Sequence, residues 1–210
     1  MPARSPTKKA RNAAKNGSAR QPRRRDGDVL EAAVKVFYER GYSAATVQDV
    51  ADELGILKGS LYHYIETKED LLFQLIDEVH TQVQLILEEV KAEPGLDPLE
   101  RLALYVRRQV EYNIANLDRV SVYYHDLESL TGERLSYVKA ARRVHTDFAA
   151  GLIGEAQKMK LAKNSDDPQL LANCVFATII WTYKWFRPGR MARKSVVDVC
   201  VRQALHGVAG

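Results

Sequence analysis

The sequence predicts an all-α fold, with a small three-helix head that contains a helix-turn-helix unit and a larger helical body, about nine helices in total. Apolar residues recur at spacings of three and four along most of the chain, and Gly, Pro or polar clusters separate these segments. No alternating strand pattern of useful length and no internal repeat are evident. With 210 residues, 46% of them hydrophobic, the chain is long enough to bury a sizeable core.

The first 25 residues form a strongly basic segment. They contain nine Lys or Arg and no Asp or Glu, so the net charge of +4 conceals a remainder with 22 basic and 27 acidic residues. We expect residues 1–25 to be a disordered tail, because they cannot bury enough apolar surface to offset the entropy of ordering.

The head begins with a helix that ends at Gly41 and whose buried face is expected to consist of Val29, Leu30, Ala33, Val34 and Phe37. The second helix starts after Thr46, an N-cap residue type, with Asp49 in the reciprocal capping position. Gly55 directly follows its last apolar residue, where a left-handed conformation ends a helix without a Cβ clash. These signals predict two helices joined by a glycine turn.

A third helix is expected over residues 58–65. Leu61 and Tyr64 or Ile65 can face inward, which leaves outward Lys58, Ser60, Tyr62 and His63. A cation, hydroxyls and an imidazole suit phosphates and base edges. An ordinary helical hairpin could also have polar outer residues, but here three apolar stripes and two capping signals interlock. The head therefore predicts binding to the major groove of double-stranded DNA.

The basic tail directly precedes this head. Its cations would add salt-dependent affinity for DNA that does not depend on sequence, and the alternative is a solvated tail that serves only solubility. The tail residues that we expect to contact DNA are Arg23, Arg24 and Arg25.

A long fourth helix is expected from Thr67, paired with Asp70 for capping, to about Ala92. Lys68 lies in its first turn, where the helix dipole disfavours a cation, so we expect a phosphate partner for it. Pro94, Gly95 and Pro98 then interrupt the helix.

The body is expected to contain five further helices, at residues 98–116, 119–130, 133–160, 168–186 and 195–208. Val144 and Val199 are among the expected core residues. The last two helices are more apolar than one monomer core needs, so we expect them to form a four-helix homodimer interface. A two-fold dimer would place its recognition helices about 34 Å apart, on successive major grooves of a palindromic operator.

Several residues could suggest other chemistry. His125 and Asp126 are adjacent, but neighbours on a helix point about 100° apart, and no nucleophile elbow accompanies them. The five histidines have no metal-ligand spacing, and Cys174 and Cys200 are expected to be small buried hydrophobes rather than a disulfide. We therefore expect no enzyme, no metal and no cofactor.

The longest nearly apolar run, residues 170–185, contains Asn173, Thr178, Thr182 and Lys184, so it predicts a buried helix rather than a membrane span. No apolar segment of the secretory type follows the N-terminal charges. We expect no membrane partner and a cytoplasmic protein.

Polar and aromatic residues gather on the body helices. Together they suit a mostly apolar pocket with a few orienting polar groups, which predicts a small-molecule effector. The candidate ligand-binding residues are Tyr105, Gln109, Tyr112, Tyr124, Asp126, Trp181 and Trp185.

The segments Phe37–Tyr42, Thr46–Ala51, Gly59–Ile65 and Lys68–Leu71 together resemble the TetR family of bacterial transcriptional regulators, over about residues 27–75. The resemblance implies an all-helical homodimer, usually a repressor that a small molecule releases from its operator. It implies phosphate contacts at Thr46, Tyr62 and Lys68. The positions that it places nearest the bases are Leu57, Lys58, Ser60 and His63.

The body is similar to a branch of that family, the acyl-CoA-responsive repressors of steroid catabolism, at Asp97–Leu102, Tyr124–Asp126, Leu135–Val138 and, most distinctively, Trp181 with Trp185–Gly189. This similarity implies that Trp181 lines a CoA-thioester site. The chain has Ala177 where that branch has a basic residue. Other cations that could contact the phosphates are Arg108, Arg142, Arg143 and Lys184.

These observations divide the chain into the tail, a DNA-binding domain at residues 26–72 and a ligand-binding and dimerisation domain at residues 73–210. The expected effector is an acyl-CoA or another hydrophobic molecule without CoA. A ligand-independent DNA-binding or architectural protein is the alternative function.

Overall fold

The computed structural model describes residues 22–210, with side chains from residue 27 onward. Most of the tail predicted to be disordered, residues 1–21, therefore lies outside the described part, and only residues 22–25 can be compared with that prediction. Helix α1 (Pro22–Arg40) already begins four residues before the predicted tail boundary, so Arg23, Arg24 and Arg25 belong to its first turns. Their predicted contacts with DNA concern side chains outside the described residues.

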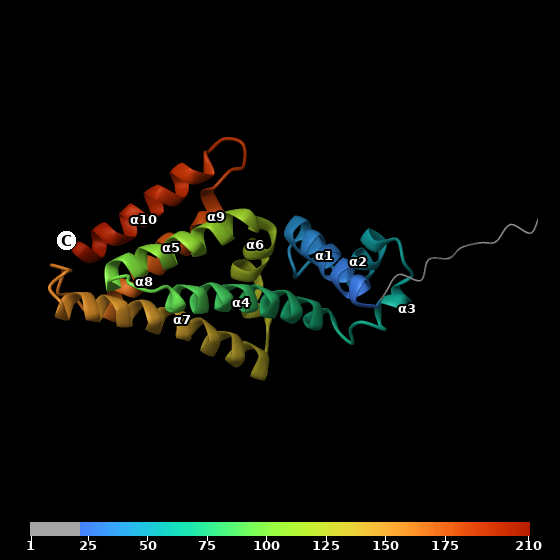
Figure 1. The fold of residues 1–210 in the computed structure, drawn as a ribbon. Coiled ribbons are helices and arrows are strands. Elements are labelled where there is room, and N and C mark those ends of the chain that lie inside the picture. The colour runs from blue at the N-terminus through green and yellow to red at the C-terminus, as the bar shows by residue number, and fades with distance from the viewer. Residues whose placement is uncertain (1–21) are drawn as a thin grey trace, which may run out of the picture.

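The described part consists of helices and loops without strands, which confirms the predicted all-α class. Figure 1 shows the head at one end of an elongated molecule and the body helices stacked lengthwise, with α4 joining the two. After α1, the elements are α2 (Val47–Leu54), α3 (Lys58–Leu61), α4 (Lys68–Ala92), α5 (Pro98–Ala115), α6 (Leu117–Asp126), the 3₁₀ helix η1 (Leu127–Ser129), α7 (Gly132–Lys158), α8 (Pro168–Ile180), α9 (Thr182–Trp185) and α10 (Arg193–Ala209).

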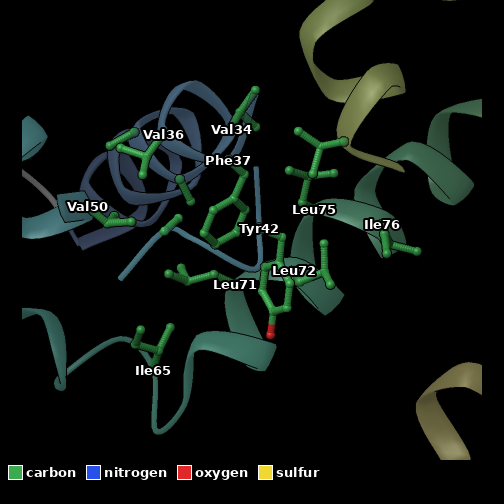
Figure 2. Close-up of a cluster of buried hydrophobic side chains, with 14 of the residues drawn as sticks. Val34, Val36, Phe37, Tyr42, Val50, Ile65, Leu71, Leu72, Leu75 and Ile76 are labelled. Atoms are coloured by element: carbon green, nitrogen blue, oxygen red, sulfur yellow. The ribbon is translucent and has the colours of Figure 1, made fainter. Parts of the chain in front are cut away.

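The head is held by an apolar core shared between α1 and α4. Phe37 and Tyr42 meet edge to face with their ring centroids 5.2 Å apart, and both lie against Leu71 and Leu72 of α4 (Figure 2). Phe37, Leu71 and Leu72 are almost completely buried. The same apolar cluster continues into the near end of the body at Val122 of α6, while the rest of the body has an apolar core of its own around Val106, Ile153 and Ala172.

Local signals define the helix-turn-helix as predicted. Thr46 and Asp49 form the capping box of α2, with the Thr46 amide 2.8 Å from the carboxylate and the Asp49 amide 3.2 Å from the hydroxyl. Gly55 closes α2 with a φ of 66°. The equivalent box of Thr67 and Asp70 starts α4.

The predicted extent of the recognition helix, residues 58–65, is wrong. Helix α3 ends at Leu61, and the chain then turns through residues 62–64. Tyr64 N donates to Leu61 O at 2.9 Å in this turn, which brings Ile65 into the head core. Helix α3 thus ends before Ile65 because Ile65 is buried in the head core, although the helical periodicity alone would continue the helix to this residue.

The predicted apolar helix at residues 168–186 is two helices. Asn113 Nδ2 and Thr182 Oγ1 both donate to the Ile179 carbonyl, at 3.1 and 2.7 Å. Side chains thus take a carbonyl that a continuous helix would use for its own ladder. The helix accordingly breaks at Trp181, between α8 and α9.

Three other core expectations are wrong. Val144 of α7 is exposed and its neighbour His145 is buried, because the buried stripe runs through Val138, His145 and Ala149. Val199 of α10 is exposed. Of the two cysteines, Cys174 of α8 is exposed and Cys200 of α10 is buried. Each of the three residues predicted to be buried but found exposed lies next to a buried residue, about 100° away around the helix.

The body helices pack around α5. Helices α4, α7, α8 and α10 all contact it, and α8 also packs on α7 and α10. Among the described residues, no helix is long and apolar enough to cross a membrane.

We expect Gly55→Ala to lower the free energy of unfolding by about 1–2 kcal/mol, because an alanine Cβ is strained at this φ although no atom lies within 4 Å of it. Gly59→Ala is the matched control: Gly59 lies inside α3 with equally open space, and alanine there should be neutral or stabilising by about 0.5 kcal/mol. Denaturant unfolding measures both. Equal effects of the two changes would contradict the assigned turn.

Candidate DNA-recognition helix and effector cavity

The surface around α3 presents the side chains that were predicted to face DNA. Lys58, Tyr62 and His63 are exposed and Ser60 is half-buried, while Leu61 and Ile65 are buried. Leu57, at the N-terminus of α3, is 79% exposed. An apolar side chain this exposed at the tip of the head has no packing role in the single chain, which agrees with a place nearest the bases. The individual contacts stay predictions.

Lys68 has partners that the sequence did not reveal. Its ammonium donates to Tyr42 O at 2.8 Å and Ala45 O at 3.0 Å, and lies 4.3 Å from the centre of the Tyr42 ring. These carbonyls explain a cation in the first turn of α4 without a phosphate. Since an ammonium has three protons, one is left for the predicted phosphate contact.

Thr46 is exposed beside this cluster, and its hydroxyl is engaged in the capping box, donating to the Asp49 carboxylate at 2.7 Å. Asp49 is also paired with Arg40 of α1. The hydrogen bonds from the Thr46 hydroxyl and amide, with a smaller contribution from Arg40, outweigh the desolvation of the carboxylate and hold the Asp49 pKa below its usual range. A phosphate contact by Thr46 stays a prediction.

The body encloses a cavity of about 460 Å³. Five helices supply its walls, α4, α5, α6, α7 and α8, and valine, tyrosine and phenylalanine side chains make much of the lining. This volume is within the usual range for small-molecule sites. The polar and aromatic lining residues include His80, Gln109, Asn113, Tyr124, Arg142 and His145.

Of the seven predicted ligand residues, Gln109 and Tyr124 line the cavity. Tyr105 lies behind its wall and hydrogen-bonds to the lining residue His145. Tyr112 packs instead against the core cluster shared by head and body, and burial raises its pKa to about 12. A ligand-binding role for Tyr105 or Tyr112 stays a prediction.

The other three predicted residues lie outside this cavity. Trp181 and Trp185 are 57% and 41% exposed at the break between α8 and α9. Asp126 is buried and lines a separate groove between the C-terminal end of α1 and α9.

The expectation that His125 and Asp126 point apart is wrong. His125 Nδ1 lies 3.0 Å from Asp126 Oδ1. Asp126, with φ −113° and ψ 0°, is the residue at which α6 gives way to the 3₁₀ helix, so regular α-helical directions no longer apply. His125 itself is exposed.

Helix α7 supplies the charge of the cavity. Lys139, Arg142 and Arg143 all line it. Lys139 is paired with Glu128 at 3.2 Å and Arg143 with Asp147 at 3.6 Å, whereas Arg142 has no ion pair among the described residues and lies 5.9 Å from the Tyr124 ring centre. Arg142 is therefore available for an anionic ligand group. Arg108 and Lys184, the other proposed cations, do not line this cavity.

Two buried histidines, which the sequence analysis did not identify, also line the cavity. Tyr105 Oη lies 2.8 Å from His145 Nδ1, and Tyr123 Oη lies 3.3 Å from His80 Nε2. Burial lowers the pKa of both imidazoles to about 4. For His80, the nearby Asp77 opposes this decrease and Arg142 adds to it. For His145, His80 and Lys91 both add to it. Both rings are neutral at pH 7. The helical spacing between Val138 and His145 was the sequence signal that could have identified His145 as buried.

The exposed face of α8 is apolar where the sequence predicted dimerisation. Leu170, Cys174, Ala177 and Trp181 are exposed along it, and Val199 is exposed on the adjoining α10. An unpartnered apolar stripe on two packed helices is what a four-helix dimer interface requires.

Two family models match the chain. The model for bacterial regulatory proteins of the tetR family matches residues 29–75, and the model for a tetracyclin repressor-like C-terminal domain matches residues 95–208. Among curated proteins, the transcriptional repressor KstR2 of Rhodococcus jostii is 28% identical over 179 residues, which are 85% of this chain and 86% of that protein.

Solved structures are also similar. AibR, in complex with isovaleryl coenzyme A and operator DNA, is 27% identical with a TM-score of 0.78, covering 85% of this chain and 97% of AibR. The ketosteroid transcriptional regulator KstR2 of Mycobacterium tuberculosis is 26% identical with a TM-score of 0.77, covering 89% of this chain and 95% of that one.

The histidine pair predicts a pH-dependent stability. Since the folded pKa of about 4 lies below the unfolded value of 6.5, the unfolded chain binds more protons between these values, and stability is lost as the pH falls from 6.5 towards 4. Each histidine should cost on the order of 2 kcal/mol between pH 7 and pH 5. His145→Gln should reduce this loss by about half in urea unfolding at the two pH values, whereas the exposed control His206→Gln should leave it unchanged. If the unmodified protein, His145→Gln and His206→Gln all showed the same pH dependence of stability, the neutral buried state of His145 would be contradicted.

Proposed function

The chain belongs to the TetR family of bacterial regulators and is a homodimeric, DNA-binding transcriptional repressor that responds to an effector. We propose that this effector is an acyl-coenzyme A thioester that binds in the cavity of the body. The observation on which the proposal depends is the unpaired Arg142 beside an otherwise largely apolar cavity. An acyl-CoA has the matching chemistry, an apolar acyl group joined to phosphates. AibR, a relative that binds isovaleryl coenzyme A and operator DNA, supports it.

At the DNA end, we propose that α3 enters the major groove with Leu57, Lys58, Ser60 and His63 nearest the bases. Thr46, Tyr62 and Lys68 would then hold phosphates on either side. The exposure of Leu57 and of the polar side chains around α3 supports this arrangement. The dimer would present two such helices to the halves of a palindromic operator.

Effector binding would reach the head through α4 and α6. His80 of α4 and Tyr124 of α6 line the cavity, and Arg119, in the first turn of α6, is paired with both Glu31 of α1 and Glu78 of α4. A ligand that favours one arrangement of α4 against α6 would thus change the position of α1 and the spacing of the two heads. This is a population shift between two dimer geometries.

A catalytic function is not part of the proposal. His125 and Asp126 form a hydrogen-bonded pair, but nothing nucleophilic is bonded to it among the described residues. No cluster of metal-ligand type occurs there either. We propose a ligand-binding regulator that acts in the cytoplasm, where bacterial DNA lies.

The DNA contacts are tested by Tyr62→Phe. Loss of one phosphate hydrogen bond should weaken binding roughly fivefold to tenfold on every operator, whatever its sequence. Tyr38→Phe is the matched control, because Tyr38 is similarly exposed at 49% against 47% but belongs to α1. Gel-shift titration measures both, and unchanged affinity of Tyr62→Phe would count against the assigned phosphate contact.

The effector is tested by release of operator DNA with hexanoyl-CoA. Arg142→Met should raise the concentration needed for half release about tenfold, because a charge-assisted hydrogen bond is lost. Arg108→Met, on α5 and paired with Glu111 at 3.8 Å outside the cavity, should behave as the unmodified protein. Release by hexanoic acid as effective as by hexanoyl-CoA would favour a hydrophobic effector without CoA.

A further inference from the structure

The two buried tyrosines determine which nitrogen of each cavity histidine has the proton. Tyr105 is fully buried and its hydroxyl has one hydrogen-bond partner among the described residues, His145 Nδ1. A buried hydroxyl must donate its proton, so Nδ1 accepts it. Since the ring is neutral, its proton is on Nε2.

The same argument applies to the second pair. Tyr123 is 3% exposed, and its hydroxyl lies against His80 Nε2, which accepts. The proton of the neutral His80 ring is then on Nδ1. Neither His80 Nδ1 nor His145 Nε2 has a partner among the described residues, and both side chains line the cavity. Each ring therefore offers one free N–H donor.

Gln109 adds a third unsatisfied group from another wall. Its side chain is 3% exposed and lines the cavity, and its Nε2 is a buried polar atom for which the described residues supply no partner. The neighbouring Asn113 differs, because its amide donates to Ile179 O at 3.1 Å. Helices α4, α5 and α7 thus each contribute a hydrogen-bonding group that the protein itself leaves unused.

We propose that the acyl group of the effector has a neutral carbonyl oxygen of its own, in addition to the thioester, that accepts hydrogen bonds from this set of donors, His80, His145 and Gln109, at most two of them at a time. The inference rests on the proposed acyl-CoA effector. A plain hydrocarbon chain would displace water from these donors and leave them unsatisfied, which disfavours its binding.

The alternatives have different chemistry. A carboxylate in the same place would have to be buried beside two neutral imidazoles. The cations near them are Arg142 and Lys91, the acid is Asp77, and the other lining cations, Lys139 and Arg143, are already paired with Glu128 and Asp147. The thioester oxygen is common to every acyl-CoA, so it cannot make the cavity prefer one acyl group over another. A ketone or similar oxygen satisfies the donors without adding charge.

The test uses three thioesters of N-acetylcysteamine, which keep the acyl group and lack the CoA phosphates: hexanoyl, 5-oxohexanoyl and adipoyl. Binding to the full chain at pH 7.5 is measured by calorimetry. The 5-oxohexanoyl thioester should bind about tenfold more tightly than the hexanoyl thioester, as expected for one well-made hydrogen bond to a buried donor. Equal affinities, or tightest binding of the adipoyl thioester, would overturn the proposal.

Gln109→Leu should reduce the preference for the oxo compound over the hexanoyl compound at least threefold. It should also not lower the thermal stability, because it removes a buried donor that has no partner. Gln84→Leu is the matched control, an exposed glutamine of α4 that bonds to Glu88, and should keep the full preference. An undiminished preference in folded Gln109→Leu would remove Gln109 from the proposal.

The CoA thioesters of the same acyl groups separate this inference from the proposed function. If hexanoyl-CoA and 5-oxohexanoyl-CoA release the operator equally well, the acyl-CoA effector stands and the carbonyl inference fails. If the oxo preference appears with N-acetylcysteamine thioesters and CoA adds no affinity, the inference about the cavity stands and the CoA part of the proposed function fails.

Discussion

The structure depends on one helix, α4, which packs in the head core at its start and lines the cavity in its middle. The first turns of α4 place Leu71, Leu72 and Leu75 in the head core, and the next turns place Val79 and His80 at the cavity. Because the helix is continuous through Ala92, a change in its position at the cavity is also a change in the head. Its start is held by the Thr67–Asp70 capping box and by the Lys68 ammonium, which joins it to the turn between α1 and α2.

The polar groups in the largely apolar cavity come at a cost to stability. Two neutral histidines and an amide without a partner are buried where apolar side chains would pack without loss, and the histidines destabilise the fold as soon as the unfolded chain can take up protons. Such groups are expected where binding, not packing, determined the residue. The unpaired Arg142 lines the same cavity, and in the proposed site it would bind the anionic part of the ligand.

Prediction from sequence was most accurate where the signal is local. The capping boxes of Thr46 and Thr67, the glycine turn at Gly55 and the breaks around Pro98 and Pro168 lie where the pattern placed them. Of the seven candidate ligand residues, two line the cavity. Aromatic residues on a helix pack equally well into a core, a wall or a surface, and composition does not distinguish these places.

The sequence by itself determined the all-α class, the helix-turn-helix and the order of the helices, because capping, helical spacing and glycine turns act between residues only a few positions apart. Only the tertiary structure decided which residues meet across long distances in the chain. The carbonyls that bind Lys68 come from residues 26 and 23 positions earlier, and the tyrosine that bonds His145 is 40 positions away. Such contacts depend on how whole helices pack, so no local pattern encodes them.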